Sequence, residues 1–232
     1  MTGRELGGGD GMYTVIGYGG TRAFRLLWLL EELGLDYEVR RYERDPRTRL
    51  APPELKAIHP LGKSPVIQDG DVTVAETGAI VEYLLETYGR GRLRPPAGTE
   101  AGLRFTYWLH YAEGSAMPPL LLKLVFSMLP RRSPALMKPI VNSIAAKAQT
   151  SFVDPQTQAH VDYWEAELGR SAWFAGDEFS AADIMMSFPV EAGADRAFDA
   201  AARPNLKGFL ERIHARPAYQ RALERGGTYT YA

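Results

Sequence analysis

Glu76 and Thr77 place a carboxylate and a hydroxyl at the point where an apolar helical pattern begins. The N–H groups at the start of a helix, together with a hydroxyl, can bind a carboxylate. Glu76 could then bind a cationic amine on the same ligand. A ligand that carries both groups is an amino acid or the γ-glutamyl end of a peptide. The alternative is simple capping, because threonine is a good N-cap and an acidic residue favours the helix dipole.

Two further turn signals, Ser64-Pro65 and Asp69-Gly70, precede this pair. Because proline is tolerated at the start of a strand, a trans edge proline is one interpretation of Pro65. A cis Ser64–Pro65 bond is the other, and it would expose the main chain of Ser64 to a ligand. Asp-Gly between two short apolar runs is a strong hairpin signal. The hairpin would bring Ser64 and the start of the Thr77 helix to one side of a small sheet.

Composition excludes several other chemistries. The chain has 232 residues and no cysteine, so it has no disulfides, no thiolate zinc site and no mechanism that uses a protein thiol. The net charge of −1, with arginines interleaved among acidic residues, argues against nucleic-acid binding. Metal-ligand spacing is missing among the four histidines, so we expect no metal site. They are His59, His110, His160 and His214.

Residues 12–89 show the pattern of a small α/β domain. Strands are predicted at 12–18, 37–42, 65–68 and 72–75, and helices at 21–33, 53–58 and 77–88. The order β-α-β-α-β-β-α implies one parallel crossover followed by an antiparallel hairpin. Residues 1–11 lack the apolar core of a signal peptide and are interpreted as a flexible extension.

Residues 90–98 are rich in Gly, Pro and Arg and are predicted to be a linker, beyond which residues 99–232 form an all-helical domain. Ser180 and Asp183 form a capping-box pattern at the start of one helix. The other helices are predicted at 99–129, with an interruption at Pro118-Pro119, and at 135–148, 155–168, 205–215 and 218–224.

The most apolar run is Met117–Leu129. It is shorter than the roughly 20 residues that span a bilayer, and we interpret it as a buried helix. We therefore expect a cytoplasmic protein that does not associate with membranes.

The block from Pro60 to Ile80 resembles the glutathione-binding half of the cytosolic glutathione transferases. Their signature runs P-L-G-x-x-P, then D-G, then E-S/T-x-A-I. This chain reads Pro60-Leu61-Gly62-Lys63-Ser64-Pro65, Asp69-Gly70 and Glu76-Thr77-Gly78-Ala79-Ile80. RAFRLLWLLEELGLDYE, APPELKAIHPLGKSP and SAADIMMSFP are also similar to a fungal and bacterial subgroup that includes the yeast membrane-associated type. The resemblance therefore covers nearly the whole chain.

This resemblance implies a thioredoxin-like N-terminal domain, an all-α C-terminal domain and a homodimer. It also implies that the main chain of Ser64, before a cis Pro65, pairs with the cysteinyl part of glutathione. Glu76 and Thr77 would hold the γ-glutamyl amine and carboxylate. Lys63 stands where some classes use a basic side chain for the glycyl carboxylate.

The family activates the glutathione thiol by a hydrogen bond to the thiolate from a hydroxyl, or it uses a cysteine. A donor bonded to the charged form lowers the thiol pKa, and the thiolate is the nucleophile. Aligning Arg22-Ala23 with the family makes Thr21 and Tyr18 the candidates, and we favour Thr21 or its N–H. The alternatives are that Thr21 caps the first helix and that Tyr18 packs at the end of a strand.

Tyr107, Trp108 and Tyr111 would line an apolar pocket for the second substrate, although their helical spacing also fits a packed core. The implied function is a glutathione transferase that conjugates glutathione to hydrophobic electrophiles. Peroxidase activity on a peroxide, or disulfide reductase activity with two glutathiones, is compatible with the same site. The alternative is a non-catalytic binding or interaction module on the same fold.

Overall fold

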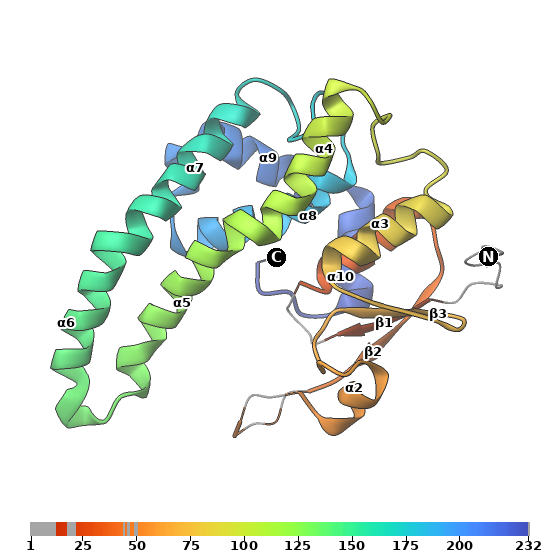
Figure 1. Ribbon diagram of the computed structural model, residues 1–232. Helices are drawn as coiled ribbons and strands as arrows, with labels where there is room; N and C mark the ends of the chain where they lie inside the picture. The colour runs from red at the N-terminus through yellow and green to blue at the C-terminus, as the bar shows by residue number, and fades with distance from the viewer. Residues whose placement is uncertain (1–12, 18–21, 44, 46, 49–50, 232) are drawn as a thin grey trace.

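The computed structural model describes residues 13–17, 22–43, 45, 47–48 and 51–231 (Figure 1). The predicted extension at residues 1–11 lies outside them. The N-terminal domain holds a four-stranded sheet in the order β2-β1-β3-β4. Its strands are β1 (Tyr13–Gly17), β2 (Tyr37–Arg41), β3 (Val66–Asp69) and β4 (Val72–Ala75). β1 runs parallel to β2 and antiparallel to β3, and β3 and β4 form the hairpin, so the predicted crossover and hairpin are confirmed.

Three helices complete this domain, namely α1 (Phe24–Leu33), α2 (Pro53–Ile58) and α3 (Thr77–Tyr88). α1 is almost wholly buried because it packs against both α3 and the C-terminal helices. Gly34 ends it in the left-handed region at φ 68°, a conformation that glycine adopts without steric cost. The N-cap of α1 is Ala23. Thr21, whose alternative role is to cap this helix, lies outside the described residues.

The Asp69-Gly70 turn is tied to α3. The hydroxyl of Tyr83 donates to the Asp69 carboxylate at 2.5 Å, and the hydroxyl of Tyr88 donates to the same oxygen. Asp69 is buried, so these bonds replace the water that its carboxylate would otherwise need. They fix the β3–β4 hairpin against the helix that begins at Thr77.

The helical domain begins with two long helical columns. The first comprises α4 (Glu100–Tyr111), the π-helical turn η1 (Ala112–Ala116) and α5 (Met117–Arg132). The second comprises α6 (Lys138–Ala148), the π-helical turn η3 (Gln149–Val153) and α7 (Asp154–Leu168). The predicted interruption at Pro118-Pro119 is wrong. Those prolines lie in the first turn of α5, where a missing N–H is tolerated, and the irregularity falls in η1 instead.

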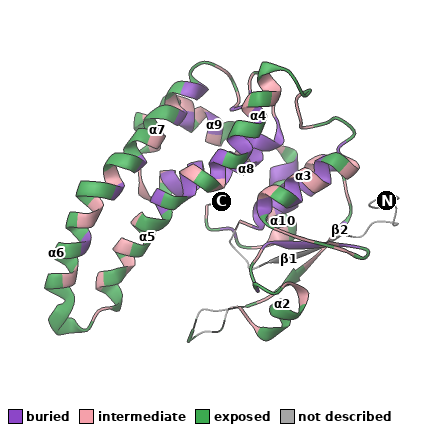
Figure 2. Ribbon diagram, in the orientation of Figure 1, coloured by how far each residue is buried: buried purple, intermediate pink, exposed green. Residues whose placement is uncertain are grey.

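The interpretation of Met117–Leu129 as a buried helix is also wrong over most of its length. Met117 and Leu120 are buried, but Leu121, Val125 and Leu129 are exposed. The reason is that α5 and α6 pack on each other and project from the body of the molecule, as Figure 2 shows by their mostly exposed surface. None of the helices in the described ranges is both long and apolar enough to cross a bilayer.

The remaining helices are α8 (Ala181–Arg196), α9 (Pro204–His214) and α10 (Pro217–Gly226). The predicted capping box of α8 is confirmed, and it is buried. The Ser180 N–H donates to Asp183 Oδ2 at 2.9 Å, and the Phe174 N–H donates to Oδ1 at 2.8 Å. Burial raises the pKa of Asp183 to about 6, although these N–H bonds pull it down.

Replacing Asp183 by alanine should lower the free energy of unfolding by about 2–4 kcal/mol, because two buried N–H groups lose their acceptor together with the helix cap. Since the folded-state pKa is raised, the contribution of Asp183 to stability falls as the pH rises from 3.8 to about 6. The difference between wild type and variant should therefore shrink over that range. Urea unfolding at several pH values measures both effects.

Asp199 offers the matched control, because it accepts from the Ala201 N–H at 2.9 Å as an exposed cap. Asp199→Ala should cost at most about 1 kcal/mol. Equal losses for the two variants would contradict the role assigned to the buried cap.

Candidate functional site

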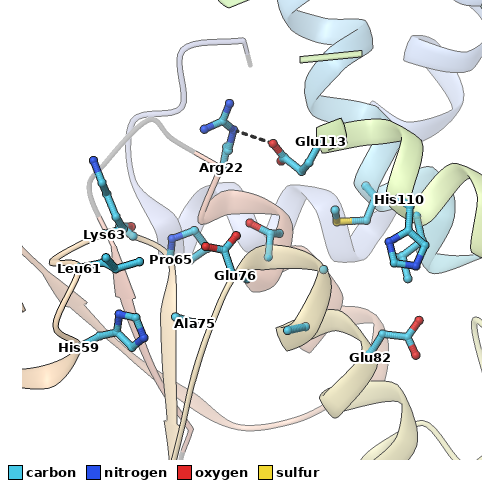
Figure 3. Close-up of a pocket in the computed structure, with 16 residues that line it drawn as sticks. Arg22, His59, Leu61, Lys63, Pro65, Ala75, Glu76, Glu82, His110 and Glu113 are labelled. Atoms are coloured by element: carbon cyan, nitrogen blue, oxygen red, sulfur yellow. Dashed lines mark ion pairs between the residues drawn. The ribbon is translucent and has the colours of Figure 1, made fainter. Parts of the chain in front are cut away.

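A cavity of about 590 Å³ opens between the two domains. One wall comes from the loop before β3 and from the first turns of α3. The other comes from the helical domain. Figure 3 shows Pro65 and Glu76 at the centre, with Lys63 and His59 to one side and His110 to the other. The wall from the helical domain consists of Leu109, His110, Glu113 and Met185.

All five residues predicted to bind glutathione line this cavity, and they are Lys63, Ser64, Pro65, Glu76 and Thr77. The Ser64–Pro65 peptide bond is cis, so the interpretation of Pro65 as a trans edge proline is wrong. Ser64 lies in the loop before β3, and Glu76 follows β4 directly. The hairpin therefore returns the chain to the cavity within a dozen residues, as the turn signal predicted.

The start of α3 faces the cavity without any side-chain cap. Glu76 is the N-cap residue, no side chain accepts from the helix there, and Thr77 is already the first helical residue. The first intrahelical bond runs from the Ile80 N–H to the Glu76 carbonyl at 2.9 Å. The N–H groups of Thr77, Gly78 and Ala79 come before that bond, which makes this helix end an anion site. The interpretation of Thr77 as a simple N-cap is therefore wrong, because the N-cap residue is Glu76.

Glu76 has a left-handed backbone, with φ 72° and ψ 120°. A non-glycine residue in this region costs about 1–3 kcal/mol and persists where the surrounding structure imposes it. Here the chain must turn from the end of β4 into α3, and the turn directs Glu76 into the cavity. Backbone strain of this kind is frequent at ligand-binding sites.

An ion cluster that the sequence analysis missed closes the cavity toward the helical domain. Glu113 lies in η1 and pairs with Arg22 at 3.4 Å and with Arg25, whose side chain is fully buried (Figure 3 marks the first pair). Arg25 also donates to the carbonyl of Met185 in α8 at 2.9 Å. Nothing in the linear sequence joins Glu113 to the start of α1, because 88 residues separate Arg25 from it.

The charges of this cluster do not cancel. Burial would raise the pKa of the Glu113 carboxyl, but Arg25 and Arg22 outweigh that effect and hold the pKa below its usual value. Glu113 is therefore ionised at neutral pH, and two guanidinium groups face one carboxylate. The excess positive charge lies beside the cavity and favours an anion there.

The two thiol-activating candidates, Thr21 and Tyr18, lie outside the described residues. Arg22 follows Thr21 directly in the chain and lines the cavity. Thr21 is therefore one peptide bond away from a residue of the site. This neighbour relation supports the preference for Thr21 but leaves it a prediction.

Tyr107, Trp108 and Tyr111 are not among the residues that line this cavity. They lie on the side of α4 opposite to Leu109 and His110, in an aromatic cluster with α7. Trp108 stacks on Tyr163 at 5.3 Å between ring centroids, and the Tyr111 hydroxyl bonds the His160 ring. Burial raises the pKa of Tyr111 to about 12. In the part of the chain that the structure describes, no group of three acidic or histidine side chains could hold a metal ion.

Comparison with known families adds an independent result. The profile of the glutathione S-transferase N-terminal domain matches residues 12–86, and that of the C-terminal domain matches residues 128–217. The chain belongs to the glutathione S-transferase family. The N-terminal match includes Ser64, Pro65 and Glu76 of one wall of the cavity, and the C-terminal match includes Met185 of the other. The remaining residues of the helical wall, Leu109, His110 and Glu113, lie between the two matched ranges.

Individual members of the glutathione S-transferase family resemble this chain over most of its length. Glutathione S-transferase 1 of Saccharomyces cerevisiae is 33% identical over 88% of this chain and 91% of its own. Glutathione S-transferase 3 of Schizosaccharomyces pombe is 32% identical, over 88% and 84% respectively. A solved glutathione S-transferase from Actinobacillus pleuropneumoniae superimposes with a TM-score of 0.74 at 32% identity, covering 93% of each chain. The thioredoxin-like and all-helical domains implied by the sequence are thereby confirmed.

In this glutathione S-transferase, Glu113→Gln should lower the free energy of unfolding by about 3 kcal/mol. The variant leaves the fully buried Arg25 without its carboxylate, and an unpaired buried charge is costly. Urea unfolding checks the value. Glu86→Gln removes an exposed carboxylate 3.5 Å from Arg94 and serves as the control, with at most about 0.5 kcal/mol expected. A similar small loss for Glu113→Gln would mean that Arg25 does not depend on this partner.

Proposed function

We propose that the cavity binds glutathione and that the protein uses it as a nucleophile. The observation that carries the proposal is the meeting of the cis Ser64–Pro65 main chain, Glu76 and the uncapped start of α3 in one cavity. The γ-glutamyl carboxylate accepts from the N–H groups and hydroxyl at Thr77, and its amine pairs with Glu76. The cysteinyl main chain pairs with Ser64, and the glycyl carboxylate lies near Lys63.

Thiol activation is the chemical step in this proposal. The hydroxyl or N–H of Thr21 donates a hydrogen bond to the sulfur and so favours the thiolate over the thiol. The Arg22 guanidinium, held by Glu113, adds positive charge to the same region. Each unit by which the thiol pKa falls from about 8.5 raises the thiolate fraction at pH 7 about tenfold. The thiolate then attacks the second substrate.

The second substrate is a hydrophobic electrophile that meets Leu109 and Met185 on the helical wall. The sequence suggested three aromatic residues of α4 for this pocket, namely Tyr107, Trp108 and Tyr111. These side chains pack on the other side of α4, and they affect the second substrate only by fixing the position of that helix. The same thiolate can reduce a peroxide, or a disulfide with a second glutathione. We expect a homodimer that works in the cytoplasm, where the glutathione pool is kept reduced.

Glu76→Gly tests the binding site and its strain together. Glycine adopts a positive φ without steric cost, so the variant should be more stable by about 1 kcal/mol. It should also bind glutathione about 10- to 100-fold more weakly, because a charged hydrogen bond is lost. Thermal unfolding and calorimetric titration with glutathione measure the two effects.

Arg90 provides the control, since it has φ 50° and does not line the cavity. Arg90→Gly should change stability in the same direction and leave glutathione affinity as it was. Failure of the wild-type protein to bind glutathione, or unchanged affinity in Glu76→Gly, would overturn the proposed site.

Thr21→Ala and Tyr18→Phe distinguish the two thiol-activating candidates. Thr21→Ala should move the pKa of bound glutathione toward the free value of about 8.5 and lower kcat by about tenfold or more, while Tyr18→Phe changes neither. Ultraviolet absorbance of the thiolate reports the pKa, and a conjugation assay reports kcat. The reverse pattern would transfer the role to Tyr18. If glutathione binds to the wild type with an unshifted thiol pKa, the protein is a binding module and not a transferase.

A further inference from the structure

The segment that follows α10, residues 227–231, lies against both α8 and the start of α1, and we call it the strap. The hydroxyl of Tyr229 donates to the buried Glu191 carboxylate of α8. Its ring stacks on Phe24 in the first turn of α1, with 4.2 Å between centroids. Burial and the neighbouring carboxylate raise the pKa of Tyr229, so its hydroxyl remains a donor at neutral pH. Tyr229 therefore ties the strap to both helices.

Tyr231 extends the strap to Phe188 in the middle of α8. Its ring meets the Phe188 ring edge-on, with 5.5 Å between centroids and 75° between the ring planes. Its hydroxyl accepts a hydrogen bond from Arg196 at the end of the same helix. Because aromatic pairs favour edge-on arrangements, this contact fixes the plane of the Phe188 ring.

The Phe188 ring in turn supports two guanidinium groups. The Cζ atom of Arg22 lies 5.6 Å from the ring centroid, and that of Arg25 lies 5.2 Å from it. A guanidinium within about 6 Å of an aromatic centroid is attracted by the negative face of the ring. Arg25 is fully buried, whereas Arg22 lines the cavity. A ligand in the cavity would therefore sense where Phe188 holds Arg22.

Arg22 has few other supports among the described residues. Glu113 forms an ion pair with its Nε atom at 3.4 Å (Figure 3), yet that buried atom has no hydrogen-bond partner. The pair with Glu113 thus attracts the guanidinium without fixing its orientation. The Phe188 ring provides a second point of contact, from α8, which leaves the hydrogen-bond donors of Arg22 available to a ligand.

We propose that Phe188 and Tyr231 are positioning residues for Arg22, and that the strap thereby sets how strongly the site stabilises the glutathione thiolate. The inference rests on the proposed function, because it assigns the charge of Arg22 to the thiolate. Arg22 follows Thr21, the favoured thiol activator, directly in the chain. A positive charge held beside the sulfur favours the thiolate over the thiol, and the same charge swinging in water is screened.

A strap with a purely structural role would make different predictions. It would hold α8 against α1, and its loss would lower stability or weaken glutathione binding at every pH. The charge of Arg22 instead acts on the ionised sulfur. Its effect should be absent at a pH where the bound thiol is protonated, and also at a pH where the thiol is fully ionised.

Phe188→Leu tests the proposal, because leucine keeps an apolar side chain but has no ring face. The thiol pKa of bound glutathione should rise, and kcat at pH 7 should fall about 3- to 10-fold. The loss of kcat should vanish at a pH above the thiol pKa of the variant. Glutathione affinity at a pH below the thiol pKa should stay as in the wild type. Ultraviolet absorbance of the thiolate, a conjugation assay and calorimetric titration provide these measurements.

Tyr231 gives a second and milder test, since its side chain is only partly buried and its variants should fold even if Phe188→Leu does not. Tyr231→Ala should raise the thiol pKa in the same direction but by less. Tyr231→Phe keeps the ring against Phe188 and should restore most of the wild-type value. Thermal unfolding shows that each variant is folded at the assay temperature.

Phe179→Leu is the matched control. The Cζ atom of Arg216 lies 3.6 Å from the Phe179 centroid, and neither residue lines the cavity. This variant should leave the thiol pKa and the pH profile of kcat unchanged. The proposal is overturned, with the proposed function intact, if the wild type lowers the thiol pKa and Phe188→Leu or Tyr231→Ala does not raise it. An equal rise in Phe179→Leu, or weaker glutathione binding at low pH, also overturns it. A wild type that does not lower the thiol pKa overturns both this proposal and thiol activation.

Discussion

The buried guanidinium of Arg25 is the constraint around which the two domains meet. A fully buried charge is tolerated only when it is paired and hydrogen-bonded. Arg25 belongs to α1 of the thioredoxin-like domain, and its two hydrogen-bonding partners among the described residues, the Glu113 carboxylate and the Met185 carbonyl, belong to the helical domain. Docking of the helical domain is therefore part of what stabilises α1, and the same contact sets one wall of the cavity.

The C-terminal end of the chain secures α1 from another side. The Phe24 ring stacks on Tyr229 at 4.2 Å and meets Tyr219 edge-on at 4.8 Å. Arg216, just before α10, forms a two-pronged ion pair with Glu32 at 2.6 and 2.9 Å. A helix that is held at its start by Arg25 and along its length by α10 is a rigid base for the residues that precede it. Those residues include Thr21 and Tyr18, where thiol activation is proposed.

Local sequence patterns predicted the parts of the fold and site that local physics determines. The Asp69-Gly70 turn fixes the hairpin, and the hairpin fixes the spacing between Ser64 and Glu76, so both parts of the N-terminal wall of the cavity could be predicted from one stretch of sequence. Ser180 and Asp183 likewise form their cap within four residues. Glu113 could not be found in this way, because its partners are distant in sequence. The aromatic residues of α4 pack against α7 and do not line this cavity. The sequence could not show this, because periodicity indicates that a face is buried but not what it is buried against.

The segment Met117–Leu129 shows the same limit of sequence patterns, because its apolar content predicted burial where most of the helix is exposed. Its leucines predicted a buried helix because apolar content normally means burial, but within this segment only Met117, Pro119 and Leu120 are buried. Beyond them the body of the protein ends, and a longer helical pair continues into solvent with its apolar residues uncovered. Exposure of this kind is unfavourable in water for every residue that it involves. The boundary between the buried and the exposed part of this segment depends on where the other helices of the domain end, and no pattern within the segment itself marks that point.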